Sequence, residues 1–94
     1  MNRPYTHPGE ILLEEFVKPY GLTQKRLCEL INVGIKTISE IYNKKRGISP
    51  VMALKLANLF GTTPEFWTSA QSAYDLYVAY SKEKESIDSV KKIA

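Results

Sequence analysis

The chain is poor in the residues that catalysis and metal binding most often need. It contains one histidine, His7, and one cysteine, Cys28, among its 94 residues. A structural zinc site takes about four nitrogen or sulfur ligands and a catalytic one about three, so these two residues cannot form an ordinary zinc centre. A nucleophile–histidine–carboxylate triad would have to run through His7 alone, and the sequence has no glycine-rich phosphate loop. We therefore expect a protein that is not an enzyme and that carries no metal or cofactor.

Long apolar runs and disulfide partners are also missing. No stretch approaches the roughly 20 apolar residues that span a bilayer, and no basic-then-apolar signal opens the chain. A lone cysteine cannot form an internal disulfide, so nothing indicates an oxidising compartment. Apolar residues make up 44% of the chain and charged residues 24%, which is ordinary for one small globular domain. We expect a cytoplasmic protein with no membrane partner.

The positive charge is concentrated in one block. The net charge is only +3, but residues 18–46 hold seven basic and two acidic side chains. Residues 1–17 are acidic, and in residues 47–94 the two signs cancel. Such a block is expected of a surface that binds a polyanion, although a solvated lysine-rich face has the same composition. The motifs within the block must decide between these alternatives.

Helix start signals recur along the chain, and no stretch alternates apolar and polar residues as a strand does. A capping residue, in most cases followed by proline, marks each start. These signals are His7-Pro8, Thr23, Ser49-Pro50 and Thr63-Pro64. The sequence predicts an all-α, five-helix domain over residues 1–80. Residues 81–94 are polar and form either a frayed tail or a helical extension of the fifth helix.

A tight connection separates two of the predicted helices. Asn32 tolerates the left-handed backbone of a sharp turn, and Gly34 can begin the next helix. On that helix Ile38, Ile41 and Tyr42 share the face that packs inward. The opposite face carries polar side chains: Lys36, Thr37, Ser39, Glu40 and Asn43. Two helices joined by so short a turn, the second short and polar outside, predict a helix-turn-helix over residues 23–43.

The geometry of DNA explains what such a motif can do. A major groove about 12 Å wide admits one α-helix, whose short polar side chains can meet base edges. Basic residues beside the helix neutralise phosphates and release counterions. The flanking residues here are Lys25, Arg26, Lys44, Lys45 and Arg46. The sequence therefore predicts binding to double-stranded DNA.

Longer stretches resemble a known family. Residues 22–43, LTQKRLCELINVGIKTISEIYN, resemble the helix-turn-helix of the phage-repressor (Cro/C1, or XRE) family. The stretches HPGEILLEEFVKPYGLTQKRL, KTISEIYNKKRGIS, GTTPEFW and QSAYDL resemble the HigA-type antitoxins more narrowly. The resemblance implies a lambda-repressor-like homodimer that binds the operator of its own operon. It also implies neutralisation of a cognate toxin, typically a ribosome-dependent mRNA interferase.

The resemblance also implies roles for individual residues. It makes Gln24 and Asn43 phosphate contacts. It places Lys36, Thr37, Ser39 and Glu40 at the groove.

The chain departs from the family pattern at three places. Cys28 stands where the family usually has Ala, Asn32 where it has the turn Gly, and Gly34-Ile35 where it has Ser-Arg. Ile35 cannot hydrogen-bond, so it can lie only against a thymine methyl or against protein.

One short helix reads too few base pairs to be selective. Two copies related by a two-fold axis solve this when their reading helices lie about 34 Å apart, one turn of DNA. The neutral C-terminal half offers the remaining apolar surface, so we expect a homodimer through the fifth helix. Its expected interface residues are Tyr74, Tyr77, Tyr80, Ile87, Val90 and Ile93.

Two other functions remain open at this point. The chain could be a stand-alone phage-repressor-like transcriptional regulator without a toxin partner. It could also be a protein-interaction module in which Gly34-Ile35 has removed DNA binding. Neither the operator sequence, nor the toxin, nor the surface that the toxin covers follows from the sequence.

Overall fold

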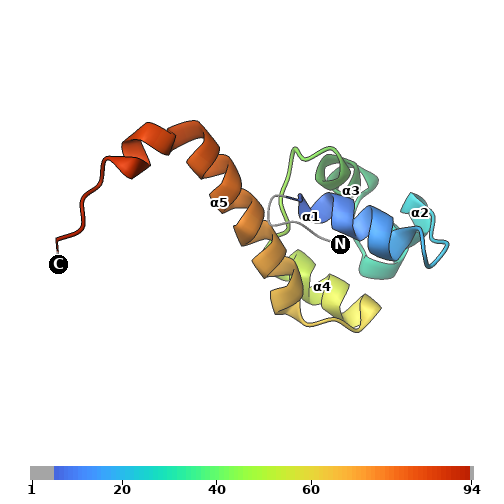
Figure 1. The fold of residues 1–94 in the computed structure, drawn as a ribbon. Helices are drawn as coiled ribbons and strands as arrows, with labels where there is room; N and C mark the ends of the chain where they lie inside the picture. Colours follow the sequence, from blue (N-terminus) through green and yellow to red (C-terminus); the bar gives the residue numbers. More distant parts are fainter. Residues whose placement is uncertain (1–5, 94) are drawn as a thin grey trace.

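The computed structural model describes residues 6–93, and within that range the chain is helical and has no strand (Figure 1). α1 continues directly into a π-helical stretch, η1, so the two form one rod. The elements are α1 (Pro8–Ile11), η1 (Leu12–Val17), α2 (Gln24–Ile31), α3 (Ile35–Tyr42), α4 (Pro50–Phe60) and α5 (Pro64–Asp88). The expected five-helix, all-α fold is confirmed.

The helices begin at the predicted capping residues. His7 Nδ1 accepts a hydrogen bond from the Gly9 N–H at 2.9 Å and opens α1. The hydroxyls of Thr23, Ser49 and Thr63 each accept from the N–H three residues ahead, at 3.0–3.2 Å. Each cap satisfies an amide that the start of a helix leaves without a partner. These local bonds explain why the sequence places the boundaries well.

The first helix differs from a regular α-helix in its second half. The Lys18 N–H donates to the Leu13 carbonyl, five residues back, at 3.0 Å. Such i→i+5 turns are rare, and the sequence pattern did not predict this one. Phe16, which lies in this stretch, packs against the rings of Phe60 and Trp67, with centroids 5.0 Å away in both cases.

The core lies between the helices, and its side chains are buried. Trp67 at the start of α5 has no exposed surface, and its indole nitrogen donates to the Thr62 hydroxyl at 2.8 Å. Cys28 is buried in α2, as its place on the apolar face predicted. The largest aliphatic side chains at 0% exposure come from four helical segments: Leu12, Leu27, Ile38, Ile41 and Leu56. Burial of this kind is the main force that holds the fold together.

The two ends of α5 have different surroundings. Its first half packs on α4 and α1, and its second half runs away from the other helices (Figure 1). We call residues 6–75 the body and residues 76–93 the α5 arm. The arm is helical to Asp88, with a break at Glu83 (φ −122°, ψ 28°). Of the two alternatives for the residues after 80, the helical extension is therefore the one that the structure shows as far as Asp88. All residues from 79 to 93 are exposed.

Candidate nucleic-acid interface

The turn between α2 and α3 is fixed by bonds on both sides. Asn32 adopts the left-handed conformation (φ 54°), and the Val33 N–H donates to the Cys28 carbonyl at 3.0 Å. The Gln24 amide donates to the Ile35 carbonyl at 3.3 Å and so joins the first turns of the two helices. The sequence predicted this turn, and the structure adds the side-chain bond across it. The angle between α2 and α3 is therefore set by the chain itself.

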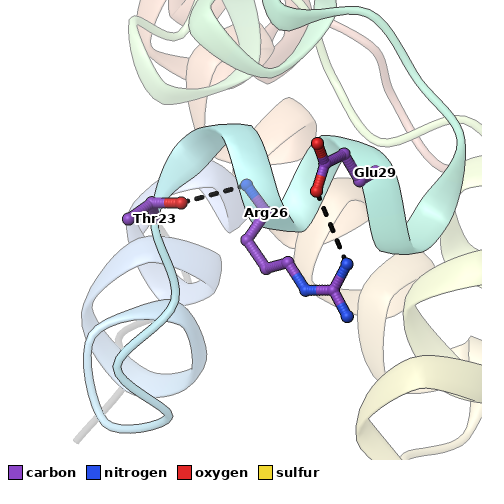
Figure 2. A network of polar contacts seen from close by, with 3 residues as sticks. All are labelled: Thr23, Arg26 and Glu29. Atoms are coloured by element: carbon purple, nitrogen blue, oxygen red, sulfur yellow. Dashed lines mark hydrogen bonds and ion pairs between the residues drawn. The ribbon is translucent and has the colours of Figure 1, made fainter.

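The start of α2 carries a small polar network (Figure 2). The Thr23 hydroxyl accepts from the Arg26 N–H at 3.0 Å, and the Arg26 guanidinium pairs with Glu29 at 3.4 Å. Both side chains of this ion pair are more than half exposed, so it contributes little to stability. The ion pair orients the Arg26 side chain along α2, toward Glu29. Lys25, next to it, is exposed and has no ion pair with any described residue.

α3 has the two faces that its sequence predicted. Ile38 and Ile41 are fully buried, which confirms the inward face. At the N-terminal end of the other face, Ile35 is 51% exposed and Lys36 is also exposed. The remaining outward residues are half-buried: Thr37, Ser39 and Glu40. The polar groups of this side are therefore at least partly open to a ligand, most of all at the N-terminal end of α3.

The residues after α3 form a basic loop, residues 43–49, that folds back over the last turn of the helix. The Lys45 N–H donates to the Glu40 carbonyl at 2.8 Å, and Lys44 adopts a left-handed backbone (φ 62°). The Arg46 guanidinium donates twice to Glu40 Oε1, from Nε at 3.0 Å and from Nη2 at 2.7 Å. This bond holds the pKa of the Glu40 carboxyl below its ordinary value, with the Lys36 and Lys45 charges acting in the same direction. Asn43, Lys44 and Lys45 are exposed.

Gln71 of α5 holds the far end of the basic loop. Its side-chain oxygen accepts from the Ile48 N–H at 2.7 Å, and its amide nitrogen donates to Asp75 at 2.9 Å. Gln71 was missed as a site residue because its partner lies 23 residues away, beyond any local pattern. The loop is therefore anchored at one end by α3 and at the other by α5.

α1 supports α3 from behind at a very close contact. Gly9 lies against the backbone carbonyl of Ile41, and a Cβ at this position would overlap that carbonyl. Glycine is needed here for space, since its φ does not lie in the left-handed region. The position of α3 thus depends on a residue of the HPGE stretch.

The structure separates the predicted dimer residues from the DNA-facing ones. Tyr74 lies on the body side of α5 and packs edge-on against the His7 ring, with centroids 4.8 Å apart. Tyr77 and Tyr80 are 51% and 42% exposed on the arm. Leu76, which precedes Tyr77 in the chain, is 72% exposed and is not among the predicted interface residues. The remaining predicted residues, Ile87, Val90 and Ile93, are also exposed.

Two negative findings apply to residues 6–93. No three His, Cys, Asp or Glu side chains come together there as a metal ion would require. None of the described helices combines the length and the apolar character needed to cross a membrane.

Comparisons with known proteins agree with this geometry. A helix-turn-helix family model matches residues 13–67. Antitoxin HigA-1 of Vibrio cholerae is 41% identical over 83 residues, which cover 88% of this chain and 78% of that protein. The chain belongs to the HigA-type antitoxins of the helix-turn-helix family.

Two solved antitoxin structures that are similar to this chain are described with DNA. Pseudomonas aeruginosa antitoxin HigA with the higBA promoter superposes with a TM-score of 0.90 at 34% identity, covering 98% of this chain and all of the other. Antitoxin GraA in complex with its operator gives a TM-score of 0.86 at 40% identity, covering 99% and 94%. Because both superpositions include almost the whole chain, the α5 arm also belongs to the shared fold.

Proposed function

We propose that this HigA-type chain is a sequence-specific DNA-binding antitoxin that represses its own operon and neutralises a cognate mRNA-interferase toxin in the cytoplasm. The observation that carries the proposal is the outer face of α3. It is mostly polar and partly exposed, it is joined to α2 by the bond from Gln24 to Ile35, and a basic loop is anchored beside it. The solved structures of similar antitoxins with promoter or operator DNA support the same function.

The roles of the side chains follow from their places on that face. Lys36, Thr37 and Ser39 lie where a helix in the major groove meets base edges. Ile35 offers only a methyl surface and fits a thymine methyl. The phosphate contacts would come from the polar and basic groups around α3: the half-buried Gln24 and the exposed Lys25, Asn43, Lys44 and Lys45.

We propose further that the chain acts as a homodimer through the α5 arm. At about 100° per residue, Leu76, Tyr77 and Tyr80 lie on one side of the helix, whereas Tyr74 turns toward His7. Contiguous exposed apolar side chains of this kind mark interaction surfaces. A second copy would cover them and place two α3 helices on one operator. The interface therefore centres on Leu76, Tyr77 and Tyr80, with Ile87 and Val90 beyond the break.

Truncation after Tyr80 tests the arm. We expect the shortened chain to keep most of its helix content, since only the last turns of α5 are lost, and to form a weaker dimer, because it keeps Leu76, Tyr77 and Tyr80 but loses Ile87 and Val90. Light scattering at micromolar concentration measures the mass, and circular dichroism the helix content. A truncated protein that remains dimeric and binds a palindromic operator as before would confine the interface to residues before 81.

DNA binding and toxin binding require separate experiments. For the first, the full chain is titrated against the DNA upstream of its own gene and against an unrelated duplex, at two salt concentrations. We expect tighter binding to the upstream DNA and weaker binding to both duplexes at higher salt. Equal affinity for the two duplexes would contradict sequence-specific repression.

For the second, the chain is co-expressed with the product of the adjacent gene. Co-purification of the two proteins, with relief of growth arrest, supports the antitoxin. A neighbour that neither binds the chain nor arrests growth would leave the stand-alone regulator as the function.

A further inference from the structure

The contact between Glu40 and Arg46 changes the part that each residue can play on DNA. Arg46 uses two donors, Nε and Nη2, on a single carboxylate oxygen, Oε1. No donor from residues 6–93 forms a hydrogen bond with Oε2. The carboxylate is therefore held at one oxygen and presents the other oxygen as a free acceptor. Glu40 is half-buried, whereas Arg46 is exposed.

The pairing is built by the backbone as well as by the side chains. The Lys45 N–H donates to the Glu40 carbonyl at 2.8 Å, which brings the basic loop over the last turn of α3. The other end of the loop is held by the bond from Ile48 to Gln71. Arg46 lies between these two anchors, so its reach toward Glu40 is set by the fold. A long, freely rotating side chain on an untethered loop would not be held in this way.

A carboxylate on the DNA-facing side of α3 needs such a partner. Alone it would repel the phosphates that flank the groove, but with the Arg46 guanidinium beside it the pair is neutral. A carboxylate accepts hydrogen bonds and donates none, so it can meet only the amino groups in the major groove. Guanine presents two acceptors there and thymine an acceptor and a methyl group, and both oppose it. Adenine places the N7 acceptor beside its amino group, which leaves the cytosine N4 amino group as the best match.

We propose that Glu40 reads a cytosine amino group in each half-site and that Arg46 is the positioning residue that holds and neutralises Glu40, not a phosphate contact. This inference rests on the proposed DNA-binding function and deepens it. It also divides the basic loop into two parts. Lys44 and Lys45 serve affinity for any DNA, whereas Arg46 serves the choice of sequence.

The test begins with the full chain and a pool of randomised DNA duplexes, from which the preferred sequence is selected. Binding is then measured to that duplex and to its single-base-pair variants. The variants of the protein are E40A, R46A, the double variant and, as a matched control from the same loop, K45A. Circular dichroism checks that each variant keeps its helix content.

We expect the parent chain to prefer C·G at one base pair by about tenfold, the size of a good single base contact. E40A and R46A should each abolish this preference, and the double variant should lose no more than either one alone. K45A should keep the preference, bind all duplexes more weakly, and reduce the slope of log K against log salt by about one. R46A should leave that slope unchanged.

Two results would overturn the inference, and they differ from a failure of the proposed function. If R46A keeps the base preference and reduces the salt slope as K45A does, Arg46 binds phosphate. If E40A selects the same sequence as the parent chain, Glu40 does not read a base. A parent chain that enriches no sequence from the pool would instead overturn sequence-specific DNA binding itself, and this inference with it.

Discussion

The body and the α5 arm are both helical, but they owe their helices to different causes. In the body, capped helix starts and fully buried side chains such as Leu56 and Trp67 hold each helix in place. In the arm no described residue from 79 onward is buried, and the helix is broken at Glu83. The Tyr80 hydroxyl donates to the Asp88 carboxylate across that break and lies 3.0 and 3.1 Å from its two oxygens.

This difference shows which region of the chain buries its apolar side chains without a partner. Isolated helices shorter than about 12–15 residues are marginal in water, and their stability in proteins comes from packing an apolar face. The body supplies that packing from its own sequence. The arm carries an apolar face and leaves it uncovered, which is why we assign it to a second copy of the chain.

The largest difference between the two regions should appear when one leucine is removed from each. Leu56 has no exposed surface, and Leu76 is 72% exposed. We expect Leu56→Ala to lower the free energy of unfolding by about 2–5 kcal/mol, because it leaves a cavity in the core. Leu76→Ala should instead weaken the dimer and make the melting temperature depend more strongly on protein concentration. Thermal denaturation at several concentrations measures both effects, and a similar loss at all concentrations for Leu76→Ala would contradict the division.

A second test acts on the contact that places α3. Gly9→Ala forces a methyl group against the Ile41 carbonyl, which belongs to the backbone and cannot turn away. We expect it to cost about 1–3 kcal/mol, as overpacking does in other cores, and to weaken operator binding by displacing α3. Gly34→Ala is the matched control for stability, since nothing lies within 4 Å of a Cβ there. Chemical denaturation of both variants should separate them, and equal stability would show that α1 does not set the position of α3.

A smaller effect on the stability of the fold is expected at acidic pH. Burial lowers the pKa of His7 below its ordinary value of 6.5, and the Lys44 charge adds to this, against weaker opposite effects of Asp75 and Glu10. The unfolded chain therefore takes up a proton at a pH where the folded chain does not. The contribution of His7 to stability is present above pH 6.5 and is lost as the pH falls below that value toward the folded pKa.

The variant His7→Asn isolates that titration. Asparagine is a good N-cap and does not titrate, so it keeps an acceptor for the Gly9 amide. As the pH falls below 6.5, we expect the stability of the parent chain to fall more steeply than that of the variant. Parallel curves in urea denaturation would mean that the His7 cap does not respond to pH.

The sequence predicts the body far better than the contacts between its parts. Caps and turns such as Thr23 and Asn32 depend on neighbouring residues, so local chemistry fixes them. The bond from Gln71 to Ile48, the close approach of Gly9 to Ile41 and the π-helical turns of η1 depend on the packed fold, and no local pattern announces them. The predicted DNA-facing set was correct in placing Ile35, Lys36 and Asn43 at the surface. Whether these residues contact DNA stays a prediction.

The central claim is that the outer face of α3 reads the operator. The most direct measurement compares the parent chain with a Lys36→Ala/Ser39→Ala double variant, on the selected operator and on an unrelated duplex. Neither side chain is buried, so the double variant should fold normally. We predict that it loses most of its preference for the operator and keeps its weak affinity for the unrelated duplex. A double variant that binds the operator as the parent chain does would show that α3 is not the reading helix.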